Sequence, residues 1–436
     1  MLARPSCWDI LRLSPTEGNP PLSTFAYRFW IAIFGSGETA LESLAVVFGL
    51  ASLVVIHRLA SEVYDEATAH LSLVLAAISP SLVSVSQQVR SYSLAVLLGA
   101  LSALFLVRRL KHDRPRDRVA FLVASYLFLN THYYALLVLF AFFLHMWIRC
   151  WPTAERRNQA IRDTLLLGLV SVPTLVALYL QYTRYRNYGW IPPPDLSLLG
   201  GTFTALAGGS VPLFDLFLLL AGIALVTHAR ARDIAPAVPL LLWLLVPPAI
   251  ALVVSLLGWP FLFPRYAVLW VVPFLLIGGR GIAVVRSLPL RVALLAIACA
   301  VTVPVLSSYY EERRSTSVEQ EASDLASVRR RPGEAILHLT KDTYIPALVH
   351  HGFPADEFLM AGASTSNVMR YWMTDRQVEI RPEELARFDA VWVFIGPDLS
   401  PDPVHTLLAT PALAARAPRV EFLGPDGRVA RVEWGR

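Results

Sequence analysis

Charge and cysteine are both scarce in this sequence. Only 16% of its 436 residues are charged, whereas soluble domains carry about 25%. The three cysteines, Cys7, Cys150 and Cys299, are far apart, so they form neither a disulfide framework nor a cysteine-based metal motif. No glycine-rich phosphate loop follows a predicted strand. Residues 1–22 contain no apolar run long enough for a signal peptide. These absences argue against a secreted disulfide scaffold and against an ordinary nucleotide-binding enzyme.

Apolar residues are abundant instead. They make up 55% of the chain, and the mean hydropathy is +0.51. A helix needs about 20 apolar residues to cross a bilayer, and the backbone in lipid must satisfy its own hydrogen bonds. We therefore predict an all-α polytopic membrane bundle of about ten transmembrane helices. The predicted spans are residues 40–59, 66–85, 90–108, 119–131, 133–149, 160–182, 210–228, 236–257, 264–284 and 289–307.

Basic residues are distributed unequally between alternate loops. Most lie in one set of loops, which the positive-inside rule assigns to the cytoplasm. This distribution also explains the formal charge of +5, so we expect no nucleic-acid partner. The basic residues of the first set are Arg108, Arg109, Lys111, Arg114, Arg116, Arg118, Arg149, Arg156, Arg157, Arg162, Arg230, Arg232, Arg280, Arg286 and Arg291. The opposite, outer set holds only Arg90, Arg184, Arg186 and Arg265.

The pattern divides the chain into three parts. Residues 1–39 include Pro20–Gly35, whose aromatic side chains favour a helix lying in the outer membrane interface; a short span is the alternative. Residues 40–308 form the transmembrane bundle. Residues 309–436 contain strand-like runs separated by helical stretches, and they predict a small α/β domain outside the membrane.

The outer arginines are the first candidates for a binding site. Arg90 precedes Tyr92, and Arg265 precedes Tyr266, each at the mouth of a predicted span. A guanidinium group at headgroup level binds phosphate through two parallel hydrogen bonds. Snorkelling to lipid headgroups is the alternative. Two Arg–Tyr pairs at span mouths favour the phosphate interpretation.

The remaining substrate-binding candidates lie in neighbouring outer segments. Gln88 lies just before Arg90, and Arg184 and Arg186 lie in a long aromatic loop. His132 and Tyr133 lie in the turn between two closely spaced spans. A histidine there is able to act as an acid, a base or a hydrogen-bond donor, while the tyrosines could equally anchor the turn at the interface.

Ionisable residues within the spans are few. Asp215 and Glu42 are the clearest, and both lie near the outer ends. An ion-coupled carrier normally keeps paired charges near the membrane midplane. This argues against a transporter.

Several segments together resemble a known family. FWIAIFGSGETALESLAVVFGLASLVVIHRLA, LAAISPSLVSVSQQVRSYSLAVLLGALSALF, THYYALLVLFAFFL and PRYAVLWVVPFLL resemble the integral-membrane glycosyltransferases of the GT-C type. The nearest group is the protein-mannosyltransferase and aminoarabinose-transferase-like family of bacterial inner membranes. The resemblance covers about Pro20 to Ser307.

The resemblance implies a function in the cell envelope. A polyprenyl-phosphate-linked sugar would be the donor, and a hydroxyl of a glycan, lipid or protein outside the inner membrane would be the acceptor. Arg90 with Tyr92, and Arg265 with Tyr266, match the basic positions that meet the donor phosphate. No cofactor is expected. We assign no metal ligands, and a requirement for a divalent metal stays open.

The general base is the unassigned part of the resemblance. Relatives carry an acidic residue in the first outer loop, after an N-terminal span, and we expect that this chain lacks that segment. Glu17 and His132 remain as candidates, while Glu42 stands where relatives commonly have arginine. The alternatives are a non-catalytic relative and a lipid-linked glycan carrier or flippase.

Overall fold

A computed structural model describes most of the chain, in two compact units. The units comprise Met1–Ser307, here called the membrane unit, and Ser308–Arg436, the C-terminal unit. The described residues are 7–13, 19–35, 37–185, 191–339, 357–360, 379–395, 402–423 and 429–434.

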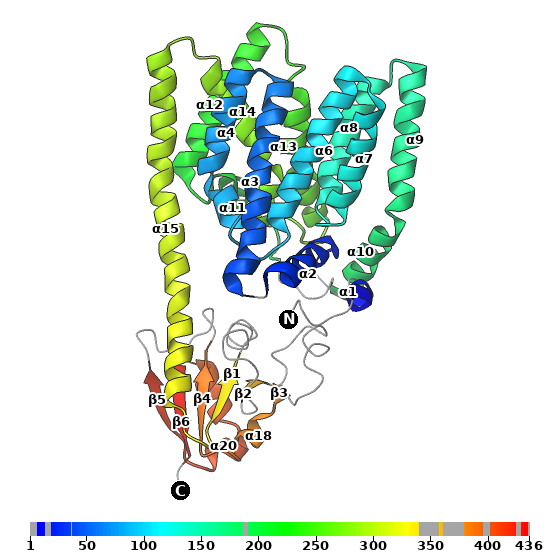
Figure 1. Cartoon of the computed structure of the whole chain (residues 1–436). Helices are drawn as coiled ribbons and strands as arrows, with labels where there is room; N and C mark the ends of the chain where they lie inside the picture. The colour runs from blue at the N-terminus through cyan, green and yellow to red at the C-terminus, as the bar shows by residue number, and fades with distance from the viewer. Residues whose placement is uncertain are drawn as a thin grey trace. The chain divides into compact units, whose positions relative to one another are not determined.

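The membrane unit is helical throughout its described length (Figure 1). Its helices are α1 (Cys7–Leu13), α2 (Leu22–Phe34), α3 (Glu38–Val63), α4 (Glu66–Ile78), α5 (Pro80–Val85), α6 (Tyr92–His112), α7 (Pro115–Leu129), α8 (Ala135–Cys150), α9 (Ala154–Val170), α10 (Val172–Tyr185), α11 (Leu196–Thr204), η2 (Ala205–Ala207), α12 (Val211–Arg230), α13 (Val238–Leu256), η3 (Pro264–Trp270), α14 (Val271–Ala283) and the first part of α15 (Leu288–Arg329). Local sequence explains several starts. Asp65 caps α4 by accepting a hydrogen bond from the Thr68 amide, and Ser210 caps α12 in the same way.

Each predicted span coincides with one or two of these helices, and the predicted fold class is confirmed. Six described helices are long and apolar enough to cross a membrane, or seven if α9 and α10, which are bent by 56° at their junction, form one span. The other predicted spans correspond to shorter helices, since α4, α7 and α8 have 13, 15 and 16 residues. The count of ten helical segments and the smaller count of full-length spans differ because several apolar runs are broken by caps or prolines. The protein is a multi-pass membrane protein.

Exposed apolar surface supports the membrane assignment. The candidate span of α15, Leu288–Glu311, has a mean hydropathy of 2.1 and is only 11% buried. On α3, Leu50 and Val54 are 59% and 63% exposed. Water would oppose such surfaces, whereas lipid does not.

Two hydrogen bonds show how the ends of the bundle are arranged. The Ser93 hydroxyl donates to the Ala45 carbonyl over 2.7 Å, which brings the starts of α6 and α3 together. Arg108 Nε donates to Glu62 Oε1 over 2.8 Å near the ends of the same helices. These helices therefore run parallel. We call the end with the starts of α3, α6 and η3 the aromatic end, and the opposite one the arginine-rich end.

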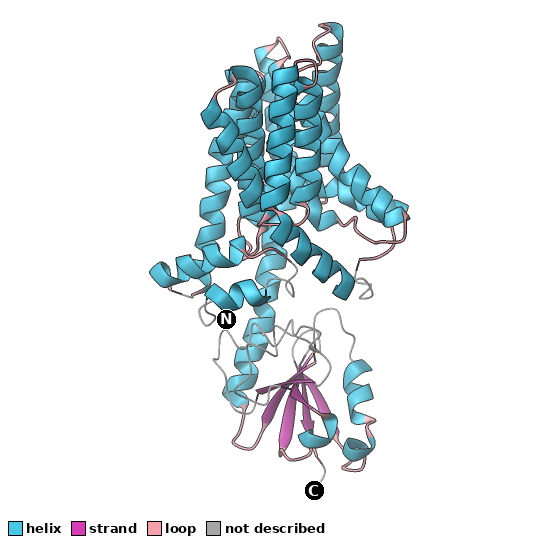
Figure 2. Cartoon of the chain, turned by 90° about the vertical axis from the view of Figure 1, so that its right-hand side faces the viewer, coloured by secondary structure: helices cyan, strands magenta, loops and turns pink. Residues whose placement is uncertain are grey.

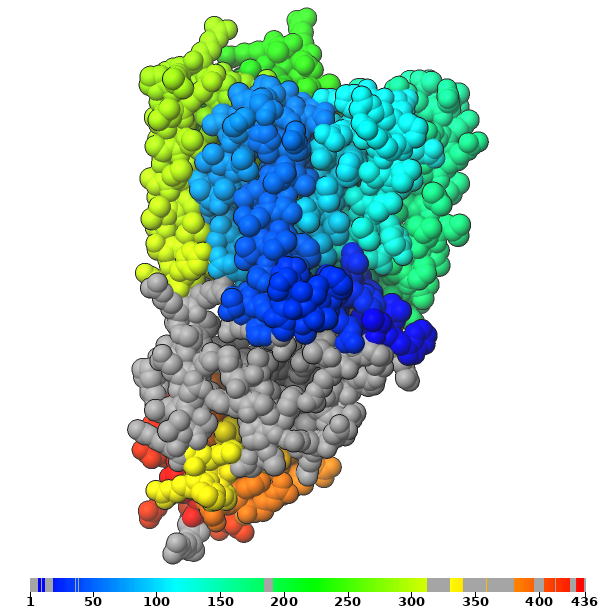
Figure 3. Space-filling model, viewed as in Figure 1, coloured from blue at the N-terminus to red at the C-terminus, as the bar shows by residue number. Residues whose placement is uncertain are grey.

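The helix α2 lies across the aromatic end (Figure 3). Its Trp30 Nε1 donates to the Ala40 carbonyl over 2.8 Å, and the amide of Leu22 donates to the Asn130 carbonyl over 3.1 Å. Phe29 and Phe34 are 69% and 55% exposed. The segment predicted as an interfacial helix is thus helical and keeps apolar side chains exposed.

The C-terminal unit contains a six-stranded sheet, shown as magenta arrows in Figure 2. The strand order is β3-β2-β1-β4-β6-β5. The strands β3, β2, β1 and β4 are parallel, and β6 is antiparallel to both of its neighbours, β4 and β5. The strands are β1 (Ala335–His338), β2 (Glu357–Met360), β3 (Glu379–Ile380), β4 (Ala390–Phe394), β5 (Arg419–Leu423) and β6 (Val429–Glu433), with the short helices α18 (Pro382–Leu385), α19 (Asp402–Leu408) and α20 (Pro411–Ala414). Sequence periodicity predicted β1, β4, β5 and β6 but not β2 or β3.

Candidate functional site

A cluster of rings lies at the aromatic end of the membrane unit. The imidazole of His132, in the turn between α7 and α8, has its centroid 5.4 Å from that of Tyr92 and 5.3 Å from that of Tyr266. Tyr134 packs against Tyr266 with 4.1 Å between centroids and stacks on Phe261 at 4.3 Å. Three separate stretches of sequence thus converge on one site.

Two guanidinium groups border this cluster. Arg265 hydrogen-bonds the Tyr92 hydroxyl, and the charges of Arg265 and Arg90 both act on Tyr92 and Tyr266. Both arginines are exposed. Among the residues that the structure describes, no carboxylate forms an ion pair with either of them. These two side chains are therefore candidates for binding an anion.

His132 is held as a neutral hydrogen-bond donor. Its Nδ1 accepts a hydrogen bond from the amide of Tyr134 over 3.2 Å, so the proton resides on Nε2. The side chain is 3% exposed, and burial lowers the pKa of His132 to about 3. At neutral pH this histidine is suited to donate a hydrogen bond, and it is poorly suited to accept a proton.

Among the residues that the structure describes, three buried polar atoms of the same turn have no hydrogen-bond partner. They are His132 Nε2 and the hydroxyls of Tyr133 and Tyr134, and the three side chains are at most 6% exposed. Burial raises the pKa of Tyr133 to about 12 and that of Tyr134 well above its ordinary value, so both hydroxyls keep their protons. Because nearly all buried polar groups in proteins find a partner, these donors indicate a place for water or a polar ligand.

The helix α2 adds a further tyrosine to this end. The Tyr27 hydroxyl donates to the Gln88 carbonyl over 3.5 Å. Burial raises the pKa of Tyr27 to about 12, opposed by the backbone amide of Arg90 and assisted by the charge of Glu42. The amide nitrogen of the Gln88 side chain donates to the Ser84 hydroxyl over 2.9 Å. Gln88 therefore positions the segment before Arg90 through both its backbone and its side chain.

A small apolar cavity lies between α3, α5 and α6. Its volume is about 130 Å³, and its lining includes Gly49, Leu82, Ser86, Ser93 and Val96. A Cβ atom at position 49 would lie 2.7 Å from the Cβ of Ser86, which is closer than carbon atoms approach. Glycine is thus required for the close approach of α3 to α5. The cavity walls flank the segment that carries Arg90.

The structure brings together most of the residues predicted from sequence. Arg90, Tyr92, His132, Arg265 and Tyr266 share the site, and the Tyr133 hydroxyl is buried in the same turn. The backbone of Arg184 lies in the last turn of α10, whereas Arg186 and Glu17 lie outside the described residues. Sequence reasoning missed Tyr27 and Phe261, which become neighbours of the site only through tertiary packing. Tyr134, next to a residue that was chosen, was detectable.

The described geometry and fold define a class of protein. The chain has the GT-C fold, since it superposes on two structures of ArnT from Cupriavidus metallidurans, one apo and one bound to undecaprenyl phosphate. The TM-scores are 0.60 and 0.61, the sequence identity is 16% in both cases, and the match covers 95% of this chain and 87% of ArnT. AglB, an oligosaccharyltransferase from Archaeoglobus fulgidus in complex with an inhibitory peptide and a dolichol-phosphate, superposes with a TM-score of 0.50 and 13% identity, over 97% of this chain and 69% of AglB.

A sequence comparison points the same way. The family model described as dolichyl-phosphate-mannose-protein mannosyltransferase matches residues 18–178. No curated protein sequence matches the chain. The family match over residues 18–178 and the shared fold both agree with the GT-C resemblance noted in the sequence.

Proposed function

We propose that this protein transfers a sugar from a polyprenyl-phosphate carrier to an acceptor hydroxyl outside the cytoplasmic membrane. The observation that carries the proposal is the pair of arginines, Arg90 and Arg265, that border the ring cluster without a carboxylate partner among the described residues. A lipid phosphate supplies the missing negative charge. As a leaving group it also gains charge in the transition state, where preplaced donors have their largest effect.

The ring cluster fits the rest of such a donor. Tyr133, Tyr134 and His132 offer buried protons to sugar or phosphate oxygens. The apolar cavity beside Ser86 offers a place for the first part of the prenyl chain. Relatives of known structure hold undecaprenyl phosphate or dolichol-phosphate, which supports the same class of donor here.

The acceptor hydroxyl requires a base. We propose an acidic residue for this role and assign His132 to hydrogen-bond donation, because burial lowers its pKa to about 3. Glu42 is a described acid whose charge acts on Tyr27. Glycan, lipid and protein acceptors all fit the proposal, and the inhibitory peptide held by AglB supports a peptide as one of them.

The distribution of arginine supports an orientation. The positive-inside rule would put the arginine-rich end in the cytoplasm and the aromatic end outside. On this proposal the protein resides in the inner membrane of a bacterium, and its C-terminal unit is extracytoplasmic. Cysteine labelling of single-cysteine variants in intact cells would test the orientation.

The test of function compares two exposed arginines at opposite ends. The full-length protein in nanodiscs is incubated with a radiolabelled polyprenyl-phosphate sugar and membranes from a deletion strain, and transfer to acceptors is counted. Arg265→Ala is expected to reduce transfer by about 10²–10³-fold. Arg230→Ala, at the exposed last residue of α12, is the matched control and should retain transfer.

The outcomes separate the competing functions. Equal and small effects of both substitutions would contradict the phosphate site. Binding of the lipid phosphate without any transfer, in the parent protein, would favour a non-catalytic relative. A flippase would instead move the intact lipid-linked sugar from one leaflet to the other in proteoliposomes, again without transferring the sugar.

A further inference from the structure

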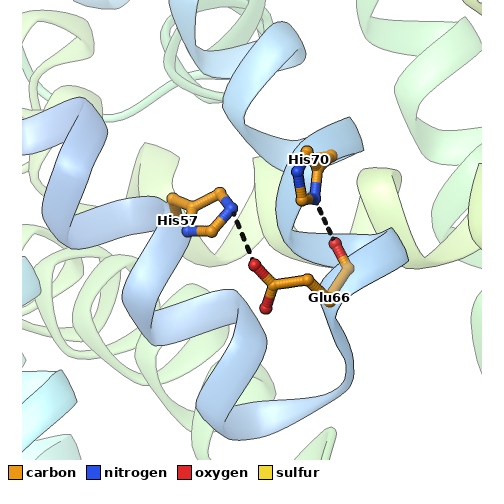
Figure 4. Close-up of side chains that lie close together, drawn as sticks. All are labelled: His57, Glu66 and His70. Atoms are coloured by element: carbon orange, nitrogen blue, oxygen red, sulfur yellow. Dashed lines mark hydrogen bonds and ion pairs between the residues drawn. The ribbon is translucent and has the colours of Figure 1, made fainter.

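A second cluster of chemically active side chains lies at the arginine-rich end, away from the proposed donor site. It consists of His57 on α3 and of Glu66 and His70 on α4, whose side chains point toward one another in Figure 4. One potential ligand atom from each residue lies within 4.8 Å of the other two. We propose that these three residues bind a divalent transition metal, and that Zn²⁺ fits the donor set best.

The distances agree with metal ligation after a small contraction. His57 Nε2 lies 3.3 Å from Glu66 Oε1. Two ligands held at about 2.0–2.1 Å from a tetrahedral zinc ion lie roughly 3.4 Å apart. The His57–Glu66 pair is thus already at the required separation, and only His70, which is exposed on the first turns of α4, has to move inward.

The tautomer of His70 is fixed in the way that metal ligands require. Its Nδ1 lies 2.7 Å from the carbonyl oxygen of Glu66, to which it donates a proton. The lone pair of Nε2 is therefore free for a metal. In ligating histidines the second ring nitrogen usually donates a hydrogen bond to a carbonyl or a carboxylate. The hydrogen bond to Glu66 therefore both orients the His70 ring and leaves its Nε2 ready to bind a metal.

The turn between α3 and α4 is anchored on both sides of the cluster. Arg280 NH1 of α14 lies 2.5 Å from Asp65 Oδ2, and its guanidinium group lies 5.2 Å from the centre of the Tyr64 ring. Tyr64 in turn stacks on His228 of α12. Because Asp65 also caps α4, the separation of His57 from Glu66 is fixed by contacts outside the cluster. A preorganised pair of ligands lowers the cost of binding a metal.

An ion pair alone explains less of this geometry. A His57–Glu66 pair accounts for the 3.3 Å contact but not for the approach of a second imidazole, whose centroid lies 5.0 Å from that of His57. Two protonated histidines would repel each other. Two neutral imidazoles and one carboxylate form the donor set of many zinc sites with an open fourth position, which water fills. Bound metal would hold α3 against α4 at the arginine-rich end.

The direct test measures zinc binding by the full-length protein, purified in detergent through a tag without histidines. Zinc is titrated in competition with a chromophoric chelator, and thermal unfolding is followed with and without zinc. The parent protein is expected to bind one equivalent with a Kd below about 10 µM and to unfold at a higher temperature when zinc is present. His70→Gln is expected to weaken binding by at least about tenfold and to abolish the shift in unfolding temperature.

His112→Gln is the matched control. His112 is also partly exposed at the arginine-rich end and also faces a glutamate, with Nε2 3.7 Å from Glu62 Oε2, but it lacks a second histidine. Its zinc affinity should equal that of the parent. Absence of a stoichiometric zinc site in the parent, or equal binding by His70→Gln and the parent, would overturn the proposal. Since His70 is exposed, loss of folding is not expected to obscure the result.

Discussion

Arginine side chains make different contacts at the two ends of the membrane unit. At the arginine-rich end, guanidinium groups pair with carboxylates of neighbouring helices: Arg108 with Glu62, Arg109 and Arg118 with Asp163, Arg156 with Asp113, and Arg280 with Asp65. At the aromatic end, Arg265 hydrogen-bonds the Tyr92 hydroxyl, and the charge of Arg90 acts on Tyr92 and Tyr266. No described carboxylate forms an ion pair with either arginine. The same residue type stabilises helix packing at one end and, on the proposed function, binds a ligand at the other.

The difference follows from electrostatics. A buried guanidinium without a counter-charge is costly, so Arg109, which is 3% exposed, needs Asp163, which is fully buried. Arg90 and Arg265 are exposed, and an exposed guanidinium group does not require a carboxylate partner. On the proposed function their charges interact with an anion, whereas the arginines of the other end already interact with carboxylates.

The largest expected effect comes from breaking the buried pair. Asp163→Ala removes the carboxylate that lies 2.5 Å from Arg109 and 2.6 Å from Arg118. The uncompensated charge of Arg109 is expected to lower the free energy of unfolding by about 3–5 kcal/mol, measured by denaturation in detergent. The control is Arg156→Ala, which breaks the half-exposed pair with Asp113 over 3.3 Å and should cost less than about 1 kcal/mol. This choice leaves the left-handed backbone of Asp113, with φ 52°, unchanged. Similar losses for both variants would contradict the contrast between buried and exposed pairs.

A smaller effect is expected at the unpartnered hydroxyls. Tyr134→Phe removes a buried polar atom that has no hydrogen-bond partner in the described part of the chain, so the ligand-free protein should be as stable as the parent or slightly more stable. Affinity for a polyprenyl phosphate sugar should fall by roughly five- to tenfold, because one hydrogen bond is lost. Calorimetric titration in nanodiscs measures the affinity, and thermal unfolding measures the stability. A less stable variant with unchanged affinity would show that the hydroxyl serves the fold and not the ligand.

The smallest expected effect concerns Asp65, the exposed N-cap residue of α4 at the arginine-rich end. Burial alone would raise the pKa of Asp65, but hydrogen bonds from Thr68 and the charge of Arg280 lower it below its ordinary value of 3.8. A carboxylate with a lowered pKa contributes stability that is present above about pH 3.8 and is lost as the pH falls through its folded-state pKa. Asp65→Asn should therefore cost less than about 1 kcal/mol at pH 6.

The pH dependence provides the control for that variant. The difference between Asp65→Asn and the parent should shrink to zero at pH values below the folded-state pKa of Asp65, as followed by denaturant unfolding between pH 3 and pH 6. Arg280→Gln should show a similar cost at pH 6, and the double variant should cost less than the sum of the two. A difference that persists at the acid end would assign the effect to the cap of α4 and not to the ion pair.

The helices of the membrane unit were predictable because each apolar run has to form its own backbone hydrogen bonds. The convergence of Arg90, Tyr92, Arg265 and Tyr266 was predictable in part, since alternating loops place them at one end of the bundle. Sequence alone did not reveal that His132 lies between Tyr92 and Tyr266, because helix order around the bundle is not encoded in hydropathy. The pairing of Arg109 with Asp163 was hidden for the same reason.

Two other features lay beyond sequence reasoning. The strands β2 and β3 have four and two residues, and sequence periodicity did not reveal them. Each forms by pairing with a neighbouring strand, β2 with β1 and β3 with β2. The cluster of His57, Glu66 and His70 has a local signal, a glutamate and a histidine one helical turn apart, but the third member comes from the preceding helix. Local sequence patterns predicted most helices and strands, whereas tertiary packing determines which residues contact one another.

If the proposed function is correct, the contact between Gly49 and Ser86 affects which lipid carrier is bound. Even one methyl group at position 49 would force α3 and α5 apart. The residue at this position therefore determines the width of the cavity, and it does not contact the charged groups beside the cavity. On the proposed function, preference among prenyl chains and the rate of sugar transfer are therefore governed by different residues. Directed evolution could change the carrier while leaving the chemistry intact.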